Sequence, residues 1–155
     1  TVTRKTVRHA MDKQTILIVD DRADTRLLLR ARVTDQNSRP VFAADALQAM
    51  SVALRERPDL ILRDLGLPGG NGVMVLERFK ANSVLRGIPV IIITAEDPLV
   101  AEARTREAGA VGFLPKPVDQ AQLLAAVQQA LGTTWEDDPA SDNYVGSGIP
   151  SFPIL

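Results

Sequence analysis

Short apolar runs alternate with longer segments of helical periodicity through the middle of the chain. A continuous apolar run such as Val90–Ile93 is typical of a strand buried on both faces. Apolar residues three or four positions apart, such as Leu27, Leu28 and Ala31, predict a helix with one apolar side. The pattern predicts strands over 15–19, 41–44, 59–64, 89–94 and 111–114, and helices over 22–33, 45–57, 73–81, 99–108 and 119–131.

Several predicted helices carry start or stop signals at their ends. Pro58 follows the second helix, Gly109 the fourth and Gly132 the fifth, while Asp119 stands at the N-cap of the fifth. The alternation has a period of about 25 residues, which suits strand–helix units and not a solenoid repeat. Fully apolar strands joined by helices imply a parallel sheet covered on both faces. We therefore predict a doubly wound α/β fold with helices on both sides of the sheet.

Charge divides the chain of 155 residues into three parts. The arm 1–13 holds four basic residues and one acid, whereas the tail 133–155 holds four acids and no base, with several prolines and glycines. The block 14–132 between them is neutral, and we assign it as the folded domain and the tail as a linker or loosely held segment. Apolar side chains in the tail, such as Trp135 and Phe152, leave open that it docks on the domain, on a second copy or on a partner.

Composition excludes several classes of site. The chain has no cysteine and therefore neither disulfides nor zinc–thiolate sites, and its one histidine, His9, makes a multi-histidine metal site or a Ser-His-Asp triad hard to build. A net charge of −1 disfavours non-specific nucleic-acid binding. No apolar run approaches the roughly 20 residues that cross a bilayer, and no secretory signal is visible in 1–13. We expect a cytoplasmic protein without membrane insertion.

Polar groups gather at the carboxyl ends of the predicted strands, where α/β sheets place their functional groups. The first strand ends in Asp20 and Asp21, the third in Asp64 and the fourth in Thr94, and the fifth is followed by Lys116. Neighbouring carboxylates repel one another unless a cation joins them, and Mg²⁺ suits a few carboxylates while leaving room for a phosphoryl oxygen. A hydroxyl and an ammonium group suit the other oxygens of a transferring phosphoryl group.

These residues resemble the receiver domain of response regulators in two-component signalling, including single-receiver chemotaxis regulators. The resemblance covers about 14–132 and implies a flavodoxin-like sheet of five parallel strands in the order 2-1-3-4-5. It also implies phosphoryl transfer from a histidine kinase or a histidine phosphotransfer protein. The matching segments are Ile16–Asp21, Pro58–Pro68 with Gly72, Pro89–Ala95 and Gly109–Pro117.

The resemblance assigns a role to each polar residue. It implies that Asp64 is the phosphoacceptor, that Asp64, Asp21 and the backbone carbonyl of Gly66 bind Mg²⁺ directly, and that Asp20 acts through water. Thr94 would hydrogen-bond the acyl phosphate.

Further roles fall at the fifth strand and just after it. By the same resemblance Lys116 would pair with the phosphoryl group, and the Lys116–Pro117 bond would be cis, as is common in the family. Phe113 stands at the position of the switch aromatic, which turns inward when Thr94 moves toward the phosphate. A plain core aromatic is the alternative for Phe113.

Some positions depart from the family pattern without removing an active-site group. Arg63 precedes the acceptor where an apolar or small residue is usual, and burying it unpaired would be costly. Two placements stay open for its side chain, beside a neighbouring acid or on the other face of the strand. Asn71 replaces the usual Asp, and Ala46 replaces a common Gly. Gly66 and Glu96 occupy the two positions that tune phosphoryl lifetime in the family; Gly66 has no side chain to shield the phosphate, whereas Glu96 has one.

Other functions fit the residues less well. A haloacid-dehalogenase-like phosphatase needs a second Asp where Gly66 stands, and a flavodoxin-type cofactor domain needs a phosphate loop where Asp20–Asp24 is acidic. A receiver-like scaffold that never accepts phosphate stays open, as does a receiver fragment of a larger hybrid kinase or effector protein.

The predicted output is binding of a protein partner. The resemblance places it on the face formed by 99–108, 111–114 and 119–131. Beyond its own phosphorylation and dephosphorylation we expect no enzymatic activity. The 23 residues after 132 are too few for a DNA-binding domain, so direct DNA binding is not expected.

Overall fold

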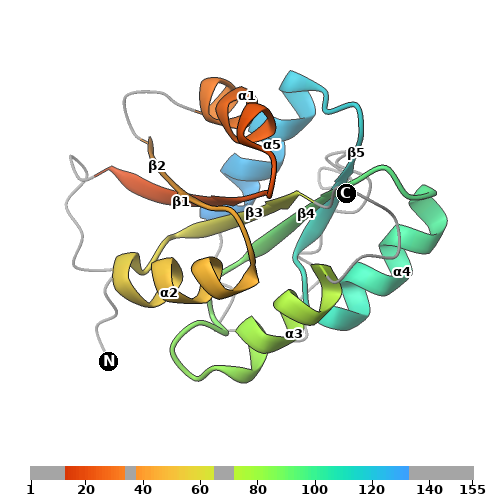
Figure 1. Ribbon diagram of the computed structural model, residues 1–155. Coiled ribbons are helices and arrows are strands. Elements are labelled where there is room, and N and C mark those ends of the chain that lie inside the picture. The colour runs from red at the N-terminus through yellow and green to blue at the C-terminus, as the bar shows by residue number, and fades with distance from the viewer. Residues whose placement is uncertain (1–12, 34–37, 65–71, 133–155) are drawn as a thin grey trace.

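Five strands form one parallel sheet in the order β2-β1-β3-β4-β5 (Figure 1). The computed structural model describes residues 13–33, 38–64 and 72–132. Most of the arm, the loop residue Gly66, Asn71 and the whole tail therefore lie outside the described residues. The strands are β1 Gln14–Val19, β2 Ser38–Ala43, β3 Leu60–Asp64, β4 Val90–Thr94 and β5 Gly112–Pro115. The predicted strand order and the parallel pairing are confirmed.

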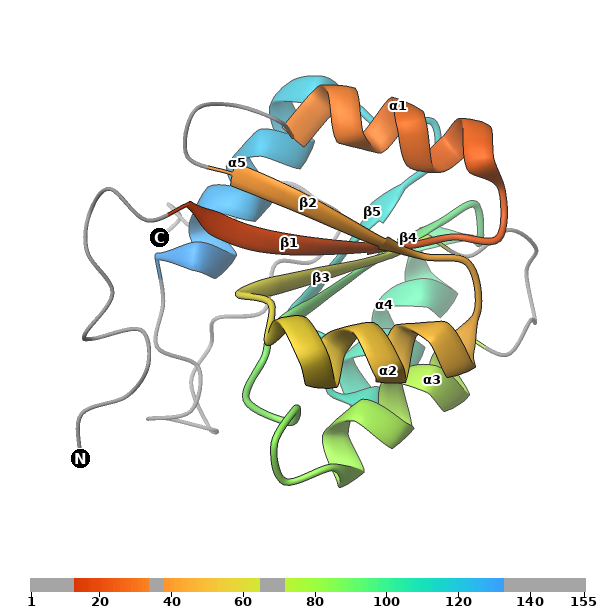
Figure 2. The same cartoon turned by 60° about the vertical axis from the view of Figure 1, so that its left-hand side comes forward.

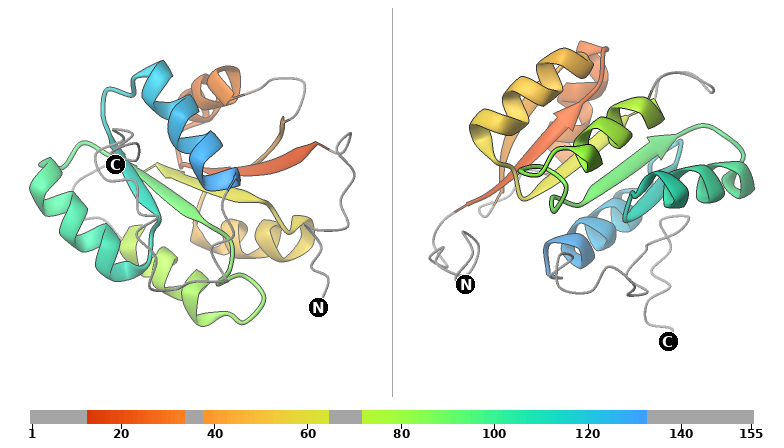
Figure 3. Two further views of the ribbon diagram at one scale, coloured as in Figure 1. Left: turned by 180° about the vertical axis from the view of Figure 1, so that it is seen from behind. Right: turned by 90° about the horizontal axis from the view of Figure 1, so that it is seen from below.

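Five helices cover the two faces of the sheet, with α1 and α5 on one side and α2, α3 and α4 on the other (Figure 2). The same two layers are visible from behind in the left panel of Figure 3. The helices are α1 Ala23–Val33, α2 Ala46–Glu56, α3 Gly72–Ala81, α4 Pro98–Ala108 and α5 Gln120–Leu131. None of these helices is long and apolar enough to cross a membrane.

The apolar strands supply both cores because their side chains alternate between the faces. In β1, Ile16 and Ile18 pack toward α1 and α5, whereas Leu17 and Val19 pack toward α2, α3 and α4. All four side chains are completely buried. This two-sided burial is why the strands read as continuous apolar runs in the sequence.

Capping interactions define several helix ends and confirm the predicted ends at Gly109 and Asp119. Asp45 caps α2, its Oδ1 accepting a hydrogen bond of 2.8 Å from the backbone N of Gln48. Asp119 caps α5 by accepting from the backbone N of Ala121 at 2.8 Å. Gly109 ends α4 with a φ of 99°, a left-handed conformation that favours glycine.

Two sequence predictions differ from the structure. Strand β2 begins at Ser38 and not at Val41, because Pro40 is tolerated in this edge strand, which pairs with β1 alone in the described sheet. In α1 the buried residues are Leu29 and Val33, whereas Leu27 and Leu28 are 60% and 52% exposed. The apolar side predicted from Leu27, Leu28 and Ala31 is therefore wrong by about one position, whereas Val33, the further candidate for that side, is buried.

The sheet order brings four strand ends together. Because β1, β3, β4 and β5 are consecutive neighbours and all parallel, their carboxyl ends lie at one edge of the sheet (Figure 1). The chain runs outward in opposite directions from β1 and β3, so the ends of these two strands form the switch point where doubly wound sheets bind ligands.

Candidate functional site

Asp20 and Asp64 lie side by side at the switch point. Val19 at the end of β1 is the register partner of Arg63 in β3, so the residues that follow, Asp20 and Asp64, are neighbours. Both are buried, with 1% and 3% of their surface exposed, whereas Asp21 is exposed. The structure therefore brings two of the three predicted carboxylates into close electrostatic contact and places the third at the rim.

Asp20 is held by its neighbours in the chain but keeps one oxygen unpaired. Its Oδ1 accepts a hydrogen bond of 2.6 Å from the backbone N of Arg22, and its carbonyl accepts one of 2.6 Å from Arg26 Nη1. Among the described residues Oδ2 has no hydrogen-bond partner. Burial, together with the nearby charge of Asp64, raises the pKa of Asp20 to about 6 despite the hydrogen bond from Arg22.

Asp64 forms an ion pair with Lys116, which stands just after β5. Burial raises the pKa of Asp64, and the ammonium group of Lys116 opposes that rise. The backbone N of Lys116 donates a hydrogen bond of 2.9 Å to the carbonyl of Thr94, which ties the lysine to the end of β4. The expected cis peptide bond between Lys116 and Pro117 is present.

Along the sheet, Thr94 lies between Asp64 at the end of β3 and Lys116 just after β5. It ends β4, which pairs with β3 on one side and with β5 on the other, and it is buried. Its Oγ1 accepts a hydrogen bond of 3.1 Å from the backbone N of Glu96, which leaves the hydroxyl proton to be donated elsewhere. The residues of the predicted phosphoryl site thus come from four adjacent strand ends.

The carboxylate of Glu96 is bound by Arg104 on α4. Arg104 Nη1 lies 2.8 Å from Oε1 and 2.6 Å from Oε2 of Glu96. This charge-assisted contact fixes the Glu96 carboxylate against α4.

Phe113 is completely buried in the core between the sheet and α2, α3 and α4. It lies in β5 opposite Ile92 of β4, and Ile92 stands two residues before Thr94. An inward aromatic is compatible both with the switch predicted for it and with plain core packing, and the switch stays a prediction.

The sequence leaves open whether Arg63 reaches a neighbouring acid or the other face of its strand, and the structure brings it near the acids. It is half-buried, and its Nη1 lies 3.4 Å from the carbonyl oxygen of Asp64. Burial lowers the pKa of Arg63, while the carboxylates of Asp20, Asp21 and Asp64 oppose that effect. Its position directly before the strand-end Asp was the available signal, but the sequence did not show where so long a side chain would reach.

The donor set fits a hard divalent cation. Asp20 and Asp64 are buried, mutually repelling oxygen donors, and the unpaired Oδ2 of Asp20 is the kind of atom that a cation or its water satisfies. Within the described ranges no cluster of three His, Cys, Asp or Glu side chains is found. Mg²⁺ does not need one, because it commonly takes one or two carboxylates and keeps several waters. Gly66, the predicted carbonyl ligand, lies outside the described residues.

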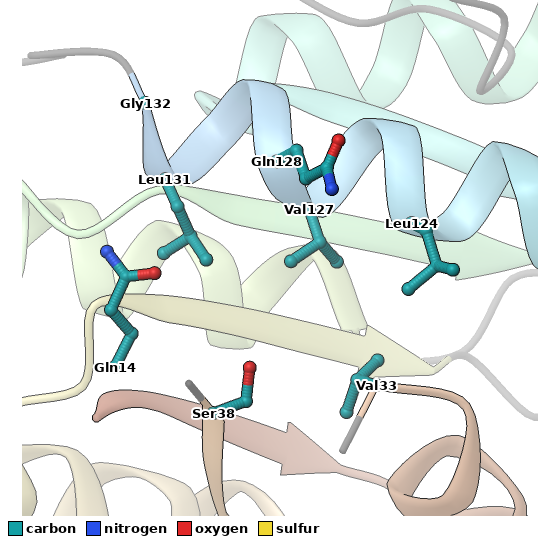
Figure 4. A pocket seen from close by; sticks show the side chains of 8 residues that line it. All are labelled: Gln14, Val33, Ser38, Leu124, Val127, Gln128, Leu131 and Gly132. Atoms are coloured by element: carbon teal, nitrogen blue, oxygen red, sulfur yellow. The ribbon is translucent and has the colours of Figure 1, made fainter. Parts of the chain in front are cut away.

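A separate pocket of about 320 Å³ lies at the amino ends of the strands, opposite the carboxyl ends (Figure 4). Side chains of α1 and α5, including Val33, Leu124, Val127 and Leu131, meet there with Gln14 at the start of β1. None of its lining residues is titratable, and it lies at the amino end of β1, away from Asp20 and Asp64. The candidate functional site is therefore the one at the carboxyl ends of the strands and not this pocket.

Comparison with known families agrees with this geometry. The family model of the response regulator receiver domain matches residues 16–128. The chain belongs to the response regulator receiver family.

Named relatives of this receiver differ in length. The response regulator PleD of Caulobacter vibrioides is 38% identical over 113 residues, covering 73% of this chain but 25% of its own length. The receiver thus spans about a quarter of that relative. The sporulation initiation phosphotransferase F of Bacillus subtilis is 36% identical over 121 residues, covering 78% of this chain and 96% of its own.

A solved structure shows the same fold in a receiver with a metal. The receiver domain of the sensor histidine kinase PA1611 from Pseudomonas aeruginosa is 30% identical and superimposes with a TM-score of 0.68. The match covers 78% of this chain and 99% of that one, which is described with a magnesium ion coordinated in its active-site cleft.

Proposed function

We propose that this receiver accepts a phosphoryl group on Asp64 from the phosphohistidine of a histidine kinase or a histidine phosphotransfer protein, in the cytoplasm and with Mg²⁺. The observation that carries the proposal is the buried Asp64 carboxylate, placed beside Asp20 and ion-paired with Lys116 at the switch point of the sheet. The alternative is a receiver-like scaffold that never accepts phosphate, and the half-buried Arg63 beside Asp64 is the observation in its favour.

The proposed reaction is a direct transfer between two side chains of different proteins. An oxygen of the Asp64 carboxylate attacks phosphorus, and the bond between phosphorus and the histidine nitrogen breaks. The bonding electron pair stays on the imidazole, which takes up a proton, and Asp64 becomes an acyl phosphate. Binding energy and electrostatics do most of the work in such a transfer, because the reacting groups need mainly to be aligned and their charge offset.

The residues around Asp64 have the chemistry to offset that charge. We infer that Lys116, now paired with Asp64, moves its ammonium group onto a phosphoryl oxygen, and that the Thr94 hydroxyl donates to another. Asp20, Asp21 and Asp64, with the carbonyl of Gly66, would hold the metal. Bound Mg²⁺ supplies positive charge to the phosphoryl oxygens during transfer.

We propose that phosphorylation changes a partner-binding face formed by α4, β5 and α5. Thr94 is joined to this face through the hydrogen bond from Lys116 and through the pairing of β4 with β5, in which Phe113 lies. At the start of α4, Leu99 is 82% exposed and gives the face an apolar contact point. The expected partner is a protein, and direct DNA binding is not part of the proposal.

Intact-mass spectrometry after incubation with acetyl phosphate tests the proposal. We expect one added phosphoryl group that requires Mg²⁺ and is absent from Asp64→Asn. Asp59→Asn is the matched control, because Asp59 is equally buried but lies at the other end of β3, where it accepts a hydrogen bond from Thr15. This control should be phosphorylated like the unaltered protein. No addition under any condition would overturn the proposal in favour of the scaffold.

A further inference from the structure

Arg63 introduces a positive charge where the sheet otherwise presents apolar side chains. Its register partners are Val19 in β1 and Ile92 in β4, both completely buried on the face that packs against α2, α3 and α4. Arg63 is only half-buried there, although the Nε of its guanidinium group is buried.

The guanidinium group lies within the electrostatic reach of the acidic cluster, which comprises Asp20, Asp21 and Asp64. All three carboxylates attract it. Its Nη1 lies 3.4 Å from the carbonyl oxygen of Asp64, and its Nε has no hydrogen-bond partner among the described residues. Among the described residues the arginine therefore lies near the acids without a full set of hydrogen bonds, so its charge acts on the cluster as a whole.

We infer that Arg63 is a resident counter-charge of the acidic cluster that lowers the affinity of the site for Mg²⁺. The inference rests on the proposed metal site and deepens it. A fixed positive charge several ångströms from a divalent cation weakens its binding on the order of tenfold, even with water-like screening. Phosphorylation of this receiver then requires a higher Mg²⁺ concentration than it would with an apolar residue before the acceptor.

The same charge has an opposite effect on the metal-free protein. Asp20 and Asp64 are buried together, and their repulsion is offset by Lys116 and by Arg63. Without the arginine the metal-free cluster is less stable, because one of the two charges that offset the carboxylate repulsion is gone. The metal-bound cluster is more stable, because no arginine repels the bound cation. Mg²⁺ should therefore raise the unfolding temperature of an Arg63-neutral variant more than that of the unaltered protein.

Calorimetric titration of Mg²⁺ at fixed ionic strength tests the inference. We expect Arg63→Met and Arg63→Gln to bind Mg²⁺ about tenfold more tightly than the unaltered protein, and Arg63→Lys to bind like it. Arg39→Met is the matched control: it also removes one strand arginine, but Arg39 pairs with Glu56 at 2.8 Å and its side chain also contacts Thr15, far from the acidic cluster. Arg39→Met should leave the Mg²⁺ affinity unchanged.

The possible results separate this inference from the proposed metal site. Equal affinity in the unaltered protein and both neutral variants would leave the metal site standing and overturn the role of Arg63. Weaker binding in the neutral variants would overturn it too, because Arg63 would then be positioning the ligands. Absence of saturable binding in all variants would overturn both. Binding by the neutral variants alone, or folding of a neutral variant only with Mg²⁺, would support the inference.

Discussion

At the scale of single residues, Asp20 links Mg²⁺ binding to pH. Its pKa is raised to about 6 in the metal-free site, chiefly by burial. A cation favours the ionised carboxylate, so binding must release the proton that Asp20 holds below that pH. We therefore expect the affinity for Mg²⁺ to rise as the pH increases through about 6 and then to level off.

Calorimetric titrations at about pH 5 and pH 7.5 measure this effect. At one pH unit below its pKa about nine in ten Asp20 side chains are protonated, so binding should be roughly tenfold weaker at the lower pH. In Asp20→Asn the ratio between the two affinities should shrink, since the titrating group is gone. An equal affinity at both values in the unaltered protein would contradict the prediction.

At the scale of secondary-structure elements, Gly109 sets the end of α4 and so the start of β5. Its φ of 99° is strained for a side chain, and an added Cβ would lie 3.1 Å from Cγ of Lys80. We expect Gly109→Ala to lower the free energy of unfolding by about 1 kcal/mol or more. Gly87→Ala is the matched control, because nothing lies within 4 Å of the Cβ it would add.

Urea unfolding of both variants checks this prediction. The control should stay within about 0.5 kcal/mol of the unaltered protein. Similar losses in the two variants would mean that α4 can end without a left-handed residue.

At the same scale, the ends of the strands could be predicted from the sequence, whereas the packing of individual side chains could not. The place of Asp64 and Thr94 at strand ends is predictable because apolar strands end visibly, and parallel strands must bring their carboxyl ends together. The buried side of α1 was misjudged because three leucines stand in a row and only packing decides that Leu29 faces the sheet. The position of Arg63 near the acids depends on the reach of a flexible side chain, which periodicity does not encode.

At the scale of the whole molecule, the proposed metal site couples ligand binding to folding. The buried carboxylates of Asp20 and Asp64 come from different strands, and they meet only when β1 and β3 are paired. Mg²⁺ that binds this pair therefore binds the folded state, and the unfolded chain has no equivalent site. A concentration tenfold above the dissociation constant should add about 1.4 kcal/mol to the free energy of unfolding.

Urea unfolding with Mg²⁺ and with a chelator measures this coupling. We expect the midpoint to rise with Mg²⁺ in the unaltered protein, and the rise to be largely lost in Asp64→Asn, which removes one of the two buried carboxylates. The denaturant slope should stay constant, because the metal changes stability and not the surface exposed on unfolding. A Mg²⁺ effect of equal size in Asp64→Asn would mean that the cation stabilises the fold elsewhere, and that the switch point at the ends of β1 and β3 is not its site.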